Sequence, residues 1–178
     1  SETSLKLTEL QLEVAKRVID SINKEKFERF LIDGVTGSGK TEIYFEAVNE
    51  VLKKGNQVLI LLPEISLVDS LVKRINKRFG FKPDVWHSET KSSRKKEVWK
   101  DIYSGKAKII VGARSSLFLP FKNLNLIVVD EEHDTTYKQQ DQIIYNARDM
   151  AIARGSFENS TVILVSATPS LETLFNVK

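Results

Sequence analysis

The stretch that decides the fold is Gly34-Val35-Thr36-Gly37-Ser38-Gly39-Lys40-Thr41, which fits the pattern G-x-x-x-x-G-K-S/T at every fixed position. An apolar run that ends at Asp33 precedes it, and a helical pattern over 42–53 follows it. A glycine-rich turn between a strand and a helix lets backbone N–H groups converge on phosphate oxygens. A chance glycine-rich turn would lack this context, so the segment predicts a phosphate-binding loop.

Each polar residue of this loop has an expected role toward ATP. The Lys40 ammonium supplies a point charge near the β- and γ-phosphates, and the Thr41 hydroxyl is a ligand for Mg²⁺. The remaining candidate nucleotide-binding residues offer mainly their backbone N–H groups. They are Gly34, Thr36, Gly37, Ser38 and Gly39.

A second candidate site follows the apolar run Leu126-Ile127-Val128-Val129, which leads directly into Asp130-Glu131-Glu132-His133. A buried strand that ends in carboxylates places them at the carboxyl edge of a parallel sheet, where a phosphate loop also lies. We expect Asp130 to hold Mg²⁺ through water and Glu131 to orient and deprotonate the attacking water. Alone, the cluster could equally be a solvated turn, but the phosphate loop favours a catalytic role.

The rest of the chain alternates apolar strands with helical patterns, which indicates an α/β fold with a mostly parallel central sheet and helices on both faces. Ser66 is a plausible N-cap of one helix, and Trp86 and Trp99 are expected in the core. Gly55 and Gly105 end two of the helices. Strands are expected near 29–33, 57–62, 85–86, 108–111, 126–129 and 162–165, and helices near 7–22, 42–53, 66–79, 93–103 and 147–154.

Composition limits the possible classes of protein. The 178 residues suit one domain, and the net charge of +3 does not by itself indicate a nucleic-acid partner. With no cysteine and two histidines, we expect no disulfide and no zinc site in this chain. No signal peptide and no membrane-spanning stretch are seen, so a cytoplasmic location is expected. The chain begins at Ser1 and its only methionine is Met150, from which we expect a fragment of a longer protein.

Several further segments resemble the motifs of superfamily-2 DNA helicases, and in particular the PriA family of replication-restart helicases (primosomal protein N′). The resemblance covers nearly the whole chain, from about Leu7 to Val177. The most specific part is the series DEEH–YKQQ–ARD, between Asp130 and Asp149. The other matching segments are Leu7–Gln11, Leu62–Leu67, Gly112–Ser115, Ser166–Pro169 and Leu171–Thr173.

The resemblance implies that residues 1–178 form one RecA-like P-loop lobe, the first lobe of a 3′–5′ helicase acting at stalled forks. It implies ATP and Mg²⁺ as cofactors, and Gln11 as the residue that contacts adenine. The implied partners are single-stranded and forked DNA, primosome proteins, and the second helicase lobe and other domains of the same protein. No second-lobe motif and no cysteine-rich zinc region is present in this chain, and no membrane partner is implied.

The residues expected to face DNA have structural alternatives. Ser66 could offer a helix start to a phosphate or simply cap the helix. Arg114 follows a strand and could contact the DNA backbone or form a surface ion pair. Tyr137 and Tyr145 could stack on bases or pack in the core. The resemblance adds Arg148, whereas Ile143, Ile144 and Glu89 depart from the family pattern.

Other functions remain open from the sequence alone. Another superfamily-2 translocase is possible, although the DEEH–YKQQ series speaks against it. A nucleotide kinase would need a lid and acceptor-binding arginines that we cannot identify. A nucleotide- and DNA-binding module without turnover is the non-enzymatic alternative, and measuring ATP turnover would separate it from a motor.

Overall fold

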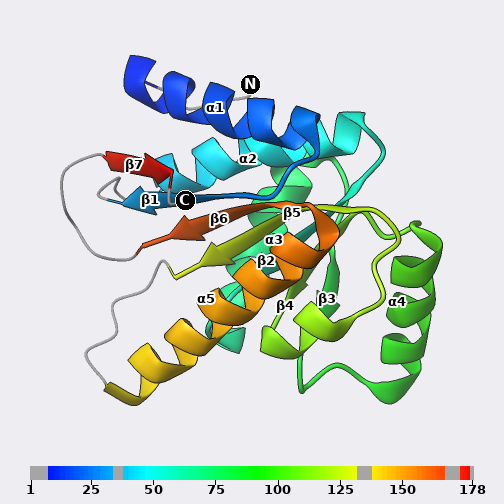
Figure 1. The fold of residues 1–178 in the computed structure, drawn as a ribbon. Coiled ribbons are helices and arrows are strands. Elements are labelled where there is room, and N and C mark those ends of the chain that lie inside the picture. Colours follow the sequence, from blue (N-terminus) through cyan, green and yellow to red (C-terminus); the bar gives the residue numbers. More distant parts are fainter. Residues whose placement is uncertain (1–7, 34–37, 132–137, 167–172, 177–178) are drawn as a thin grey trace.

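The computed structural model describes residues 8–33, 38–131, 138–166 and 173–176, and for Ser38, 138–146 and 173–176 it describes the backbone alone. Five α-helices, two short 3-10 helices (η) and seven strands occur in this part of the chain (Figure 1). In chain order they are α1 Glu9–Lys24, β1 Glu28–Asp33, α2 Ser38–Lys53, β2 Gln57–Leu61, η1 Ile65–Leu67, α3 Val68–Phe79, β3 Asp84–Trp86, α4 Ser92–Ser104, β4 Ile109–Gly112, η2 Arg114–Phe118, β5 Leu124–Asp130, α5 Lys138–Glu158, β6 Thr161–Val165 and β7 Thr173–Asn176.

The strands form one sheet in the order β3-β4-β2-β5-β6-β1-β7. Strands β1 to β6 pair in parallel, and only β7 runs antiparallel, against β1. The carboxyl ends of β1, β5 and β6 therefore meet at one edge, where β1 leads toward α2 and β5 ends at Asp130. This edge is where ligands bind in open parallel sheets.

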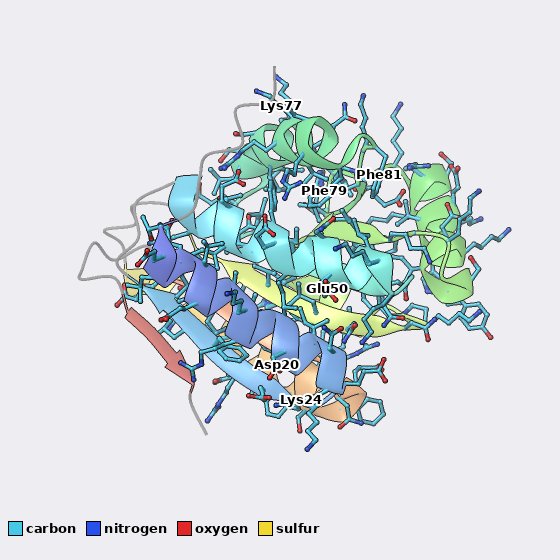
Figure 2. The ribbon with its side chains drawn as sticks, turned by 90° about the horizontal axis from the view of Figure 1, so that it is seen from above. Asp20, Lys24, Glu50, Lys77, Phe79 and Phe81 are labelled. Carbon is cyan, nitrogen blue, oxygen red and sulfur yellow. The ribbon has the colours of Figure 1, made fainter. Side chains whose placement is uncertain are left out.

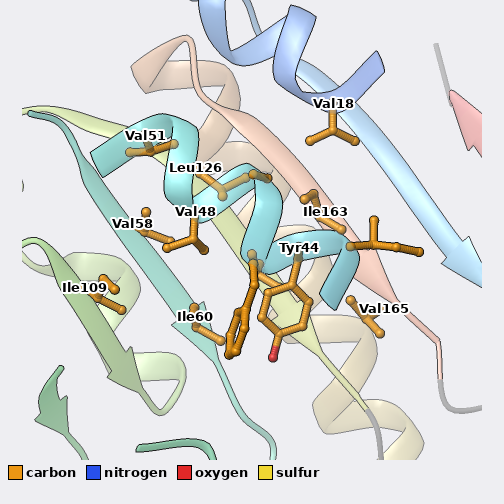
Figure 3. Packing of buried hydrophobic residues seen from close by; sticks show 14 of the residues in the cluster. Val18, Tyr44, Val48, Val51, Val58, Ile60, Ile109, Leu126, Ile163 and Val165 are labelled. Atoms are coloured by element: carbon orange, nitrogen blue, oxygen red, sulfur yellow. The ribbon is translucent and has the colours of Figure 1, made fainter. Parts of the chain in front are cut away.

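Helices cover both faces of the sheet, so the central strands are apolar on both sides (Figure 1). One core layer lies beneath α1, α2 and α3, and the other lies beneath α4 and α5. Successive residues of β5 alternate between them: Val128 packs in the first layer and Val129 in the second. In the first layer, the ring of Tyr44 lies among aliphatic side chains of the neighbouring strands (Figure 3).

Helices α1 and α2 run side by side over the first layer (Figure 2). Thr8 caps α1: its hydroxyl accepts a hydrogen bond from the backbone N of Gln11, and the Gln11 side chain accepts one from the backbone N of Thr8. Asn23 on α1 donates to Glu50 on α2 over 3.1 Å. In the described part of the chain, no helix combines the length and apolarity needed to cross a membrane.

The predicted α/β fold is confirmed, and the expected strands agree with the observed ones within two residues at each end. The N-cap predicted at Ser66 is wrong, because Ser66 lies within η1 and α3 begins after it without a side-chain cap. The core position predicted for Trp99 is also wrong: Trp99 is 44% exposed and stacks on Tyr103, one turn further along α4.

The largest difference concerns α5. The predicted helix covered 147–154, whereas α5 begins at Lys138 and ends at Glu158. Tyr145 and Asn146, which the prediction placed before the helix, therefore lie inside it. Strand β7 was not predicted at all, and it extends the sheet beyond β1.

Candidate functional site

The first turn of α2 brings two of the predicted ATP-binding residues to the carboxyl edge of the sheet. Lys40 and Thr41 are both buried, with 3% and 1% of their surface exposed. The Lys40 ammonium donates a hydrogen bond to the backbone oxygen of Ser166, just beyond the end of β6. A helix N-terminus carries positive potential, so this position favours an anionic ligand.

The other residues of the predicted phosphate loop are only partly described. Gly34, Thr36 and Gly37 lie outside the described residues. Ser38 is the first residue of α2, although its side chain lies outside the description, and Gly39 belongs to the first turn. The described part of the loop thus has the strand-to-helix placement that the motif requires.

The predicted catalytic carboxylates stand at the end of β5, and both are buried. Asp130 is 4% exposed and accepts a hydrogen bond from the hydroxyl of Tyr44 over 2.7 Å. Tyr44 lies one turn after Lys40 on α2, so both side chains project from the same side of that helix. Glu131 is 5% exposed, and its backbone N–H bonds to the carbonyl of Val165 on β6.

Thr41 and Asp130, the predicted Mg²⁺ ligands, line one pocket of about 140 Å³ together with Arg74. The guanidinium of Arg74 donates to the Thr41 hydroxyl over 3.1 Å. A hydroxyl and a carboxylate are the hard oxygen donors that Mg²⁺ prefers, and Mg²⁺ usually takes few protein ligands beside phosphates and water. Among the described residues, no cluster of three or more His, Cys, Asp or Glu side chains could hold a metal ion alone.

Sequence reasoning missed three polar residues at this edge. Tyr44 and Arg74 contact the predicted Mg²⁺ ligands, as described above. Asp33 ends β1, and within the described residues its buried Oδ1 has no hydrogen-bond partner. The spacing of Tyr44 from Lys40 was a usable signal, whereas Arg74 looks like any charged residue on the polar side of an amphipathic helix.

The predicted adenine contact, Gln11, is largely buried and takes part in the cap of α1, where its side-chain oxygen accepts from Thr8. Its amide nitrogen is not engaged in that cap, so the geometry is compatible with a further contact. Its role toward adenine stays a prediction.

The residues expected to face DNA are distributed over three described elements. Ser66 is exposed in η1, and its hydroxyl lies 3.3 Å from Glu64 Oε2. Arg114 is exposed at the start of η2. Arg148 projects from α5 and forms an ion pair with Glu131.

Arg114 and Glu131 also line a common pocket of about 180 Å³, next to the ends of β2, β4 and β5. Tyr137 lies outside the described residues, and Tyr145 is described only as a backbone position within α5. The DNA contacts of all these residues stay predictions.

Known proteins are similar to this chain over most of its length. Residues 8–177 match the family model of the DEAD/DEAH box helicases. The chain is 53% identical over 166 residues to replication restart protein PriA of Rickettsia felis, covering 93% of this chain and 26% of that protein. It is 41% identical over 168 residues to replication restart protein PriA of Bacillus subtilis, covering 94% of this chain and 21% of that protein.

A structural neighbour shows the same fold. The structure of RecG bound to a three-way DNA junction superposes with a TM-score of 0.66 at 21% identity, covering 93% of this chain and 21% of RecG. The chain spans about a quarter of the length of the PriA proteins named above. It belongs to the DEAD/DEAH box helicase family, and over most of its length it is similar to one part of replication restart protein PriA.

Proposed function

We propose that this chain is the ATP-binding motor lobe of a 3′–5′ DNA helicase that acts in replication restart at stalled forks. The observation that carries the proposal is the meeting of two elements at one sheet edge. Lys40 and Thr41 come from the first turn of α2, and Asp130 and Glu131 come from the end of β5. Family membership and the similarity to PriA proteins supply the biological setting.

In this proposal each residue of the site has its own role toward ATP. Lys40 binds the β- and γ-phosphates, and backbone N–H groups of the phosphate loop hold the same oxygens. Thr41 and Asp130 hold Mg²⁺, which when bound neutralises phosphate charge. Tyr44 fixes one oxygen of Asp130 and thereby its orientation. Glu131 orients the attacking water and accepts its proton.

The proposal also assigns the contacts with DNA. Ser66 and Arg114 hold the backbone of single-stranded DNA, and Arg148 is a third contact. Tyr137 and Tyr145 stack on bases. Gln11 contacts the adenine of ATP.

The wider setting follows from the similarity to PriA proteins. Forked DNA, primosome proteins and a second helicase lobe are the proposed partners, and the cytoplasm is the proposed location. The second lobe closes over ATP and supplies the missing wall of the cleft.

Strand displacement tests the proposal. The complete protein that carries this chain should separate a forked duplex when ATP and Mg²⁺ are present, and it should move along a strand from 3′ to 5′. Lys40→Ala should abolish the displacement while leaving DNA binding in place. DNA binding and ATP turnover without strand separation would point instead to a translocase. Binding without any turnover would leave only a nucleotide- and DNA-binding module.

A further inference from the structure

Arg148 and Glu131 form a bidentate ion pair inside the candidate site. The Nε of Arg148 donates to Oε1 of Glu131 over 2.5 Å, and Nη2 donates to Oε2. The Glu131 side chain is 6% exposed and that of Arg148 is 25% exposed, so the pair is shielded from water. Both oxygens of the proposed catalytic base are therefore turned toward one guanidinium.

The direction of this contact is set by the pleat of β5. Asp130 lies two residues after Val128, on the same face of the strand, which α2 covers. There it accepts a hydrogen bond from Tyr44. Glu131 lies two residues after Val129, on the opposite face. Helix α5, which carries Arg148, packs against that face. The ion pair thus holds Glu131 on the α5 side of the sheet, whereas Lys40 and Tyr44 approach from the α2 side.

One pocket is lined both by Glu131 and by Arg114, a proposed DNA contact. The pocket of about 180 Å³ is bordered by Pro63 after β2, Arg114 after β4, Glu131, and Ala147, the neighbour of Arg148 on α5. Arg114 is exposed, which makes the mouth of this pocket attractive to an anion. The pocket thus connects Arg114 with Glu131, the partner of Arg148, and with Ala147 on the same helix.

We propose that Arg148 is a positioning residue that restrains Glu131, and that a phosphodiester group of single-stranded DNA releases Glu131 by taking its place on the arginine. The proposal rests on the proposed function, because it assumes that Glu131 is the general base. A planar guanidinium binds phosphate with the same bidentate geometry as a carboxylate. Exchanging one anion for the other leaves Arg148 paired, so the release does not leave a half-buried cation without a counter-charge.

The expected consequence is that DNA controls the rate of hydrolysis and not the affinity for ATP. Two sources of phosphate could compete for Arg148, namely the nucleic-acid backbone and ATP itself. If the backbone is the competitor, removing Arg148 mimics DNA and raises kcat in its absence. If ATP is the competitor, removing Arg148 weakens ATP binding and raises KM.

The test is steady-state ATP turnover by the complete protein, with no DNA and with saturating oligothymidylate. Arg148→Ala and Arg148→Gln should raise the DNA-free kcat about tenfold. The reason is that a state with released Glu131 is populated about tenfold less when the ion pair disfavours it by about 1.4 kcal/mol. The KM for ATP should stay close to that of the native protein, and stimulation by oligothymidylate should shrink by the same factor. Arg148→Lys keeps the positive charge but loses the bidentate geometry of the guanidinium, and it should give an intermediate DNA-free rate.

Arg154→Gln is the matched control, because it removes a guanidinium from the same helix, where it bonds to the Leu117 carbonyl and pairs with Glu158. It should leave the DNA-free kcat unchanged. A fall in kcat by the same factor with and without DNA in the Arg148 variants would show that Arg148 supports Glu131, and unchanged kinetics would show no coupling. Either result, or a raised KM for ATP, overturns this inference while the proposed function stands. Absence of ATP turnover in the native protein overturns both.

Discussion

At the scale of single residues, the candidate site consists of buried polar side chains that each have a specific partner. Burying a polar or charged group costs free energy unless it is hydrogen-bonded or paired, so such a concentration at one sheet edge indicates function. The side chains are Lys40, Thr41, Asp130 and Glu131, and their respective partners include Ser166, Arg74, Tyr44 and Arg148.

Lys40→Ala should abolish the stabilisation that Mg–ATP gives to the protein, because it removes the point charge at the phosphates. A ligand at a hundred times its Kd stabilises the native state by about 2.7 kcal/mol, and this increment should fall close to zero. The substitution also removes the hydrogen bond to Ser166, so the ligand-free melting temperature should drop as well.

Thermal unfolding with and without Mg–ATP measures both effects of the Lys40 substitution. Lys53→Ala, at the exposed end of the same helix, is the control and should keep the full increment. An equal increment in Lys40→Ala would remove Lys40 from the nucleotide site.

Glu131→Gln should preserve ATP binding and lose hydrolysis in the complete protein. The amide keeps the shape of the side chain but cannot accept the proton of the attacking water, and such proton transfer contributes about 10²–10⁴ in rate. Turnover together with a direct measurement of nucleotide binding checks this. Near-normal kcat in this variant would assign the base to another residue.

Single residues were predictable where a motif fixes their chemistry. Lys40 and Asp130 could be named because phosphate and Mg²⁺ demand those residue types beside a strand end. Arg74 could not, since its part in the site depends on how α3 packs beside α2, which no local pattern records. The pairing of Arg148 with Glu131 was equally hidden, because it joins two residues that each looked functional for a separate reason.

At the scale of elements, strands were predictable because burial on both faces makes them continuously apolar. Helix α5 was harder: the stretch Lys138–Gln142 carries no apolar periodicity, and Gly155 looks like a helix end. In the structure, Gly155 lies inside α5 and faces Val162 and Phe27, so its missing side chain permits close packing on β6.

Gly155→Ala should therefore destabilise the fold despite the better helix propensity of alanine. Propensity alone would favour the variant by about 0.8–1.0 kcal/mol. A Cβ at this position would overlap the buried, β-branched Val162 of a central strand, and overpacking of this kind costs about 1–3 kcal/mol.

Urea unfolding measures the balance of these two terms. The exposed neighbour Ser156→Ala should be neutral or stabilising by a few tenths of a kcal/mol. A gain in stability for Gly155→Ala would mean that α5 and β6 have room between them.

At the scale of the whole molecule, the described chain is one α/β layer structure with the candidate site at an edge of its sheet. The fold class could be predicted from the alternation of strands and helices. The antiparallel strand β7 could not, because its four residues carry no distinct pattern.

The isolated chain should bind nucleotide weakly and hydrolyse ATP very slowly, with little stimulation by single-stranded DNA. An arginine supplied from a facing domain is worth about 10³–10⁵ in rate in well-studied nucleotide hydrolases. In our proposal a second lobe forms the other wall of the nucleotide cleft, so DNA alone cannot close it. Robust DNA-stimulated turnover by these 178 residues would mean that the chain is self-sufficient or that two copies supply each other's missing wall.

The most direct test of the central claim is steady-state ATP turnover by the complete protein, with and without single-stranded DNA, for the native sequence and for Lys40→Ala. The claim is that the edge formed by α2 and β5 is an ATP-hydrolysing site under the control of nucleic acid. We predict turnover that oligothymidylate stimulates and that Lys40→Ala abolishes under both conditions. A rate of ATP turnover that DNA does not change, or that Lys40→Ala does not abolish, would contradict the claim.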